Sequence, residues 1–283
     1  MFNRELRVGT RKSPLALKQV EEIIKALADF YPAIRFKIIG IDTYGDKDRI
    51  NPISEIEGSD FFTREIEQAL LGDRIDFAVH SAKDLADQIP QGLVIAAITK
   101  SIDPFDALVL RQSSVPTLPR TEVPVRKVLG TEVSVPRLRS GLVLPRTEVL
   151  VNKGLGTEVS LSKDVVEGLV SKGNSKIDEL KNGARIGTSS LRRKTQLKAY
   201  RDDLQIVDIR GNIKERIEKL ENDGLDAIVA AACALVRLGL EDRIAQRIPF
   251  EILSPHPLQG ALAIEVREDN KELIKLLEVL NEK

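Results

Sequence analysis

Three short segments, far apart in the chain, carry the residue types of an anion-binding site. They read HSAKD at 80–84, GTSSLRR at 187–193 and RGNIKER at 210–216. Each follows a short apolar run typical of a strand, so their cations, hydroxyls and backbone amides should gather at the carboxyl edge of an α/β sheet. Asp84 is an isolated acid among the cations. This combination predicts a polycarboxylate substrate and acid-assisted chemistry.

Each segment also has a simpler interpretation. Asp84 could be a helix N-cap with Lys83 as a solvated neighbour, and the hydroxyls at 188–190 could be an ordinary cap cluster. Arg192 and Arg193 could be a surface pair. Two arginines in the first turn of a helix oppose the helix dipole, however, and this favours an anion between them. Arginine also suits bidentate recognition of carboxylates.

The arginines recur at the ends of successive predicted strands, which favours a single anion site over chance. The set is Arg11 with Ser13 beside it, Arg192, Arg193, Arg210, Arg216 and Arg237. His80 is better explained as a packed or hydrogen-bonding residue than as a base, and His256 has no evident acid partner. Cys233 lies in a run of small apolar residues and is most simply a core residue; a reactive thiol is the open alternative.

Composition excludes several other classes. The 283 residues include 43 basic and 43 acidic ones, so no global field favours nucleic acid or an anionic membrane. One cysteine allows no intrachain disulfide, and with two histidines it makes no zinc-type cluster. The chain shows no export signal and no apolar run near the roughly 18 residues of a membrane span. We therefore expect a cytoplasmic monomer rather than an exported solute-binding protein.

Apolar runs alternate with amphipathic stretches, which predicts parallel, doubly wound sheets. The expected strands are 6–8, 36–41, 75–79, 93–98, 107–110, one near 186, 205–209, 227–230 and 261–266. The expected helices are 14–30, 62–71, one from 190, 213–222, one through 235 and one from 270.

The middle of the chain contains a repeat. LPRTEV at 118–123 recurs at 144–149, and LGTEVS at 129–134 recurs at 155–160. Two copies are too few for a solenoid with a continuous core. We interpret about 112–162 as an irregular or disordered insertion, with a partner-binding arm as the alternative.

Further motifs complete a resemblance. They are RVGTRKSPLA at 7–16, RLGL at 237–240 and QGA at 259–261. Together with the three segments above, they occur in the order found in the hydroxymethylbilane synthase (porphobilinogen deaminase) family. The chain resembles this family over about 4–111 and 165–283. The resemblance implies an α/β fold of two doubly wound, type 2 periplasmic-binding-protein-like domains joined by two crossings. Domain 1 would be 1–101 plus 261–283 and domain 2 would be 104–260, with the third domain absent.

The resemblance also implies a transferase that condenses four porphobilinogens head-to-tail, with loss of ammonia, to hydroxymethylbilane. Asp84 would be the catalytic acid, assisted by Lys83. Substrate and cofactor would be held by Arg11, Ser13, Phe62, Thr188, Ser190, Arg192, Arg193, Arg210, Arg216, Arg237 and Gln259.

Three departures from the family pattern bear on activity. The family's dipyrromethane cofactor is attached to a cysteine of the third domain, and here the chain ends at Lys283, so we expect the attachment cysteine to be absent. Acids replace expected cations at 55–60, and 256–258 lacks the usual small residues. One hypothesis is therefore a transferase, whole or completed by a separately encoded C-terminal domain. The other is a non-catalytic binding module that retains the carboxylate cleft.

Overall fold

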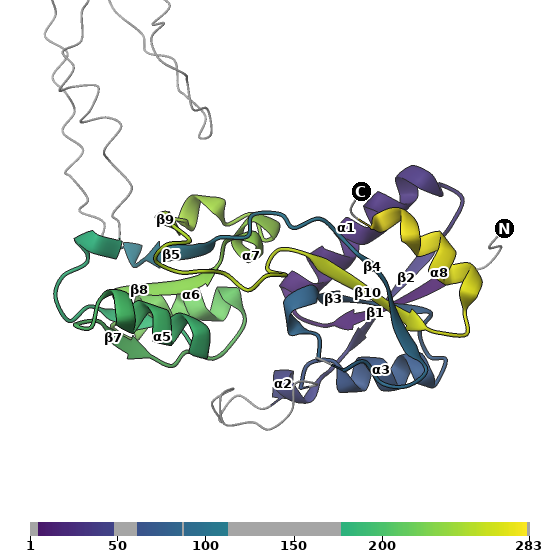
Figure 1. Cartoon of the computed structure of the whole chain (residues 1–283), viewed down its shortest axis with the longest axis horizontal. Coiled ribbons are helices and arrows are strands. Elements are labelled where there is room, and N and C mark those ends of the chain that lie inside the picture. The colour runs from purple at the N-terminus through teal and green to yellow at the C-terminus, as the bar shows by residue number, and fades with distance from the viewer. Residues whose placement is uncertain (1–4, 48–60, 87, 113–176, 282–283) are drawn as a thin grey trace, which may run out of the picture. The chain divides into compact units, whose positions relative to one another are not determined.

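The computed structural model describes residues 5–47, 61–86, 88–112 and 177–281, which contain two five-stranded sheets (Figure 1). Residues 55–60, where acids replace the expected cations, lie outside the described residues, as does the predicted insertion beyond residue 112. Our interpretation of both segments therefore stays a prediction.

The first sheet has the strand order β2-β1-β3-β10-β4. Strands β1, β2 and β3 run parallel, whereas β10 is antiparallel to both of its neighbours. The elements of this part are β1 (Leu6–Arg11), α1 (Pro14–Phe30), β2 (Phe36–Ile41), α2 (Tyr44–Lys47), α3 (Arg64–Leu71), β3 (Phe77–Ser81), the 3₁₀ turn η2 (Ala82–Asp84), β4 (Leu93–Ile98), β10 (Leu262–Arg267), α8 (Lys271–Leu277) and η6 (Glu278–Leu280).

Helix α1 illustrates how the sequence sets these elements. Ser13 is its N-cap and accepts a hydrogen bond from the Ala16 backbone N–H at 3.2 Å. Pro14 lies in the first turn, where the backbone N–H that proline lacks would have no acceptor within the helix. Its buried positions recur at helical spacing and face the sheet. They are Ala16, Gln19, Val20, Ile23 and Leu27.

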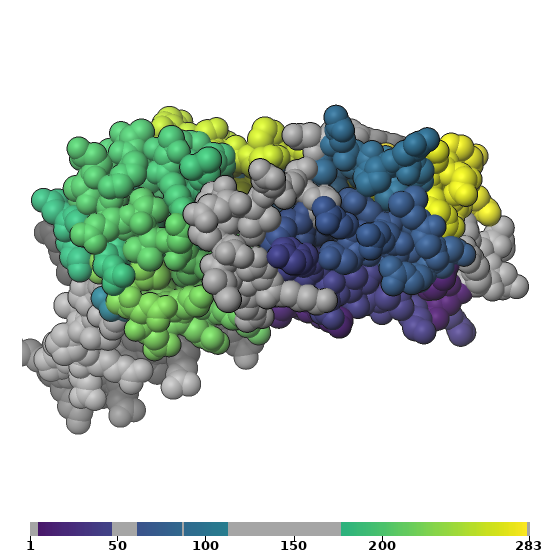
Figure 2. All heavy atoms as spheres, turned by 90° about the horizontal axis from the view of Figure 1, so that it is seen from below, coloured from purple at the N-terminus to yellow at the C-terminus, as the bar shows by residue number. Residues whose placement is uncertain are grey.

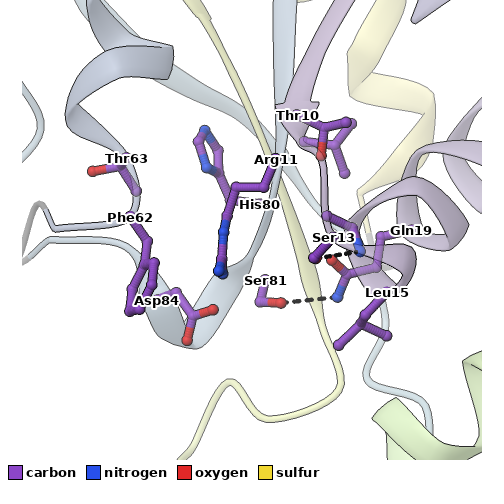
Figure 3. A pocket seen from close by; sticks show the side chains of 12 residues that line it. Thr10, Arg11, Ser13, Leu15, Gln19, Phe62, Thr63, His80, Ser81 and Asp84 are labelled. Carbon is purple, nitrogen blue, oxygen red and sulfur yellow. Dashed lines mark hydrogen bonds between the residues drawn. The ribbon is translucent and has the colours of Figure 1, made fainter. Parts of the chain in front are cut away.

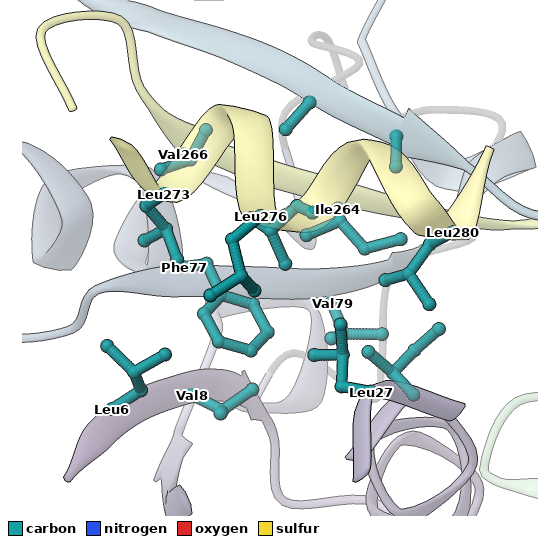
Figure 4. Close-up of a cluster of buried hydrophobic side chains, with 14 of the residues drawn as sticks. Leu6, Val8, Leu27, Phe77, Val79, Ile264, Val266, Leu273, Leu276 and Leu280 are labelled. Carbon is teal, nitrogen blue, oxygen red and sulfur yellow. The ribbon is translucent and has the colours of Figure 1, made fainter. Parts of the chain in front are cut away.

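The first sheet is covered on both faces. On one face, α1 and α8 pack over apolar side chains of β1, β3 and β10, with the fully buried Phe77 among them (Figure 4). On the other face, Ile66 and Leu70 of α3 pack against Ile75 and Ala78. Burial of both faces explains why the strands read as continuous apolar runs rather than alternating ones.

The second sheet has the order β7-β6-β8-β5-β9 and so repeats the plan of the first, with β5 in the place of β10. Helix α5 packs through Leu197 on one face, and α6 and α7 pack through Leu220 and Leu235 on the other. The elements are β5 (Asp106–Leu110), η4 (Ile177–Glu179), β6 (Arg185–Gly187), α5 (Leu191–Tyr200), β7 (Gln205–Val207), α6 (Ile213–Asn222), β8 (Ala227–Ala231), α7 (Ala232–Arg237), η5 (Glu241–Arg243) and β9 (Gln246–Ile248).

Two crossings join the sheets, at 99–105 and 249–261, and they touch where Ser101 Oγ donates to the Gln259 carbonyl at 2.6 Å. The predicted fold class of two α/β units with two crossings is confirmed. The expectation of parallel sheets is wrong for two strands, because β5 and β10, which each follow a crossing, run antiparallel to both neighbours. The proposed domain bounds remain a proposal.

The end of the described chain belongs to the first sheet. Asn281 accepts a hydrogen bond from the Ile98 backbone N–H at 3.0 Å, at the end of β4. Figure 2 accordingly shows yellow C-terminal residues on the same surface as blue residues of the first sheet. Among the described helices, none combines the length and apolar character that crossing a bilayer requires.

Candidate active site

A pocket lies at the carboxyl end of β1 and β3 and gathers four of the predicted site residues (Figure 3). These four are Arg11, Ser13, Phe62 and Asp84. The remaining lining residues are Thr10, Leu15, Ala16, Gln19, Thr63, Val79, His80 and Ser81.

Arg11, the last residue of β1, is held on two sides. Its guanidinium pairs with the Asp46 carboxylate, and its central carbon lies 4.2 Å from the centre of the Phe62 ring. Thr43 donates to Asp46 at 2.8 Å. Burial opposes ionisation of Asp46, but Arg11 outweighs it and keeps the pKa of Asp46 below its ordinary value. The arginine is therefore fixed beside an aromatic face.

Asp84 ends the short η2 turn that follows β3, and Figure 3 shows its carboxylate near Phe62 and Ser81. The wall behind it is tied together, since buried Gln19 of α1 donates to Ser81 Oγ at 2.8 Å. Asp84 is thus a half-buried carboxylate in a pocket that also contains a cation and an aromatic ring.

Lys83 extends toward the return crossing, where its Nζ lies 3.4 Å from Gln259 Oε1. Desolvation by burial, and then the charge of Arg193, lower the pKa of Lys83. His80 is a buried hydrogen-bonding residue, since its Nε2 lies 3.1 Å from Glu265 Oε2.

In the hydroxyl cluster after β6, one hydroxyl forms its hydrogen bonds with the backbone of the chain. Ser189 Oγ donates to the Ile209 carbonyl at 2.7 Å and accepts from the Ile209 N–H at 2.9 Å. Thr188 is fully buried, and its hydroxyl has no hydrogen-bond partner among the described residues. Ser190 is the N-cap residue of α5 but its side chain makes no capping bond.

An internal acid lies between Arg192 and Arg193. Asp106, the first residue of β5, accepts from Arg192 Nη2 at 2.7 Å and from Arg193 Nη2 at 2.6 Å. Gln259 donates to the same carboxylate at 2.9 Å. The sequence predicts an anion beside two arginines in the first turn of a helix, and the chain itself supplies one, the Asp106 carboxylate.

The third motif forms the start of α6. Asn212 and Glu215 make a reciprocal capping box, with bonds of 3.1 and 2.9 Å. Arg216 donates to the Gly211 carbonyl at 2.8 Å. Burial, followed by the charges of Arg193 and Arg210, lowers the pKa of Arg216 to about 10, and Asp84 opposes this shift. The charges of Arg216 and Asp84 therefore affect one another.

Arg237, at the end of α7, is paired with an acid of the first sheet's helix α1. Its Nε and Nη2 donate to the Glu22 carboxylate at 2.7 and 3.0 Å, and Nη2 also donates to the Gly260 carbonyl at 3.0 Å. Sequence reasoning missed Asp46, Asp106 and Glu22, the acids that hold four predicted site arginines. No local motif marks these acids, because each is distant in sequence from its arginine.

Comparison with known proteins identifies the family. The family model described as "Porphobilinogen deaminase, dipyromethane cofactor binding domain" matches residues 6–142 and 148–275. The chain belongs to the porphobilinogen deaminase family. A porphobilinogen deaminase from Natranaerobius thermophilus is 38% identical over 279 residues, covering 98% of this chain and 70% of that protein. One from Pelotomaculum thermopropionicum is 36% identical over 280 residues, covering 99% and 70%.

The match to the porphobilinogen deaminase family confirms the predicted resemblance and identifies the chain with a family of transferases in porphyrin biosynthesis. Among solved structures, the methionine-binding protein MetQ has a TM-score of 0.45 at 14% identity, covering 98% of this chain and 89% of that one.

Proposed function

We propose that this chain carries out the chemistry predicted above, the head-to-tail condensation of porphobilinogen with release of ammonia. The observation that carries the proposal is the pocket of Figure 3, where one half-buried carboxylate, Asp84, shares a space with Arg11 and the Phe62 ring. A pyrrole ring with acidic side chains matches this set, because the ring fits an aromatic face and a carboxylate fits a fixed arginine.

Asp84 is the residue that we assign to the reacting centre. As an acid it would protonate the departing amine, and as a carboxylate it would stabilise the positive charge that then develops on the substrate. Lys83 would act by holding the η2 turn against the return crossing through Gln259. Arg11 and Ser13 on one side, and Ser190, Arg192, Arg210 and Arg216 on the other, would bind substrate carboxylates, whereas the fully buried Thr188 is not accessible for this role.

The dipyrromethane cofactor of the family fits this chain only in part. Arg11 in the pocket suits a carboxylate of the cofactor, but the attachment chemistry lacks a suitable thiol. Cys233 is buried between Ala231 and Ala234, with Leu15, Ile102 and Ile213 packed against them. Burial raises the pKa of the Cys233 thiol, so it is a poor nucleophile at neutral pH. We therefore assign no attachment cysteine in this sequence.

The proposal is tested by measuring binding and turnover separately. Titration calorimetry with porphobilinogen should show binding to the wild-type chain and to Asp84→Asn, and weaker binding to Arg11→Leu. Ammonia release should be low for the chain alone, whose single cysteine is buried, and should rise when the part of a family member that this chain does not match is supplied. Asp84→Asn should abolish that rise, whereas a matched change at an exposed acid, Asp269→Asn, should not.

Two results would decide between the hypotheses. Binding without ammonia release under any condition would favour the non-catalytic binding module. Repeated turnover by the chain alone, with a covalent adduct on Cys233 in intact-mass measurements, would overturn our assignment of that thiol as a core residue. Absence of porphobilinogen binding would refute the proposal altogether. A cytoplasmic location and a monomeric state remain proposals.

A further inference from the structure

Asp106 is a carboxylate with no exposed surface at the start of β5. Burial of this kind is costly for a charge unless cations and hydrogen bonds surround it. Both requirements are met, because Oδ1 accepts from Arg193 Nε at 3.0 Å and Nη2 at 2.6 Å, and Oδ2 accepts from Arg192 Nη2 at 2.7 Å. The arginines outweigh the effect of burial and keep the pKa of Asp106 below its ordinary value.

The contacts of Asp106 give the two neighbouring arginines different tasks. Arg193 is 8% exposed and also donates to the Val229 carbonyl and to Gln259, both at 3.4 Å, so most of its donors serve the interior. Arg192 is 26% exposed. Its hydrogen bonds within the described residues go to Asp106 and to the Ser254 carbonyl, which leaves guanidinium donors for a ligand.

Asp106 also lies where the two crossings meet. The Gln259 amide nitrogen, from the return crossing, donates to the Pro104 carbonyl at 2.7 Å, the Phe105 carbonyl at 3.1 Å and Asp106 at 2.9 Å. The partly exposed Arg192 is therefore connected, through the Asp106 carboxylate, to both of the crossings that join the sheets.

We propose that Asp106 is a positioning residue, which aims Arg192 at a ligand carboxylate and ties this arginine to the two crossings through Gln259. The inference rests on the proposed function, in which Arg192 binds a porphobilinogen carboxylate. A flexible arginine loses conformational entropy when it binds, and a guanidinium already fixed by a buried acid avoids much of that loss. A purely structural Asp106 would affect stability and leave ligand binding unchanged.

The test compares Asp106→Asn with a matched change at the other end of the same sheet. Asp226 is also buried, accepts from the Arg185 N–H at 2.9 Å and pairs with Lys181 at 2.8 Å. Both variants should lower the melting temperature. In calorimetric titration with porphobilinogen, Asp106→Asn should raise Kd about tenfold or more, whereas Asp226→Asn should leave Kd within about twofold.

A double-mutant cycle then asks whether the effect passes through the arginine. In an Arg192→Leu background, adding Asp106→Asn should change Kd by less than about twofold, because the aimed group is already gone. Asp106→Glu keeps the charge and should fold even if Asp106→Asn does not. It should still weaken binding several-fold, since the carboxylate is displaced.

A second readout does not depend on the substrate. Phenylglyoxal modification, mapped by mass spectrometry, should proceed several-fold faster at Arg192 in the Asp106 variants than in the wild type, with Arg243 as an internal reference and Asp226→Asn as the control. If the wild type fails to bind porphobilinogen, the proposed function is refuted. The reactivity of Arg192 toward phenylglyoxal still tests whether Asp106 positions this arginine. An unchanged or lower Kd in a folded Asp106 variant, or unchanged Arg192 reactivity, would overturn the proposal.

Discussion

Removing the acid that holds Arg237 should destabilise the chain by a measurable and predictable amount. In Glu22→Gln the Arg237 guanidinium, whose side chain is 4% exposed, loses two charged hydrogen bonds of 2.7 and 3.0 Å and keeps the Gly260 carbonyl. Hydrogen bonds to charged groups contribute about 1.5–3 kcal/mol. Because Glu22 is 37% exposed, solvent screening reduces this, and we expect a loss of about 1–2 kcal/mol in the free energy of unfolding.

The neighbouring acid provides the control. Glu21 pairs with Lys18 one helical turn away at 2.7 Å, and both side chains are 54% exposed. Such surface pairs contribute about 0.2–0.5 kcal/mol, so Glu21→Gln should be nearly neutral. Urea denaturation of the two variants, followed by circular dichroism, gives the comparison. Equal losses in the two variants would refute the reasoning, because they would show that the Arg237 pair contributes no more than a surface pair.

Three further outcomes are expected. In calorimetric scans, Gly260→Ala should lower the melting temperature much more than Gly239→Ala. Both glycines have positive φ (94° and 67°), but only at Gly260 would an added methyl group overlap the Ile102 carbonyl. Similar losses in the two variants would contradict this packing argument. Because the folded state lowers the pKa of Asp106, the stability that this carboxylate contributes should be complete above about pH 4 and should be lost as pH falls through the folded-state pKa. When the free energy of unfolding is measured against pH in the acid range, the slope for Asp106→Asn should therefore be smaller than for the wild type by up to about 1.4 kcal/mol per pH unit. Equal slopes for the two proteins would contradict this expectation. Deleting about 112–162 should leave the melting temperature nearly unchanged or raise it, because loop length affects closure entropy weakly, by about 0.6 kcal/mol per doubling. A large drop would show that the segment packs.

Local patterns were sufficient for many of the elements. The helices over 14–30 and 213–222 and the strands over 36–41 and 93–98 have the expected bounds, because caps and apolar spacing are encoded within each segment. The four-residue α2 and three-residue β9 were missed, since segments this short carry too few residues to show a period. Strand direction was also beyond reach, because alternation and apolar runs look the same in either direction.

The site shows the same division between local and distant information. Arginines at strand ends could be read from the sequence, and the structure brings Arg11 together with Asp84 in one pocket. Their acid partners could not be read, because Arg11 and Asp46 are 35 residues apart, Arg193 and Asp106 are 87 apart, and Arg237 and Glu22 are 215 apart. Pairing at such separations depends on how strands are ordered in the sheets, which no single segment contains.

The interior position of β10 has a consequence for synthesis of the chain. Strands β3 and β4 are made early, yet the strand that lies between them, Leu262–Arg267, emerges only after the whole second sheet. At about 5–20 residues per second, the ribosome needs roughly 10–30 s to make the intervening segment. During that time, the facing edges of β3 and β4 lack their native partner and can pair with other chains. The second sheet, whose strands are contiguous in order of synthesis, can be complete first, so the part of the protein that is translated first is the last to finish folding.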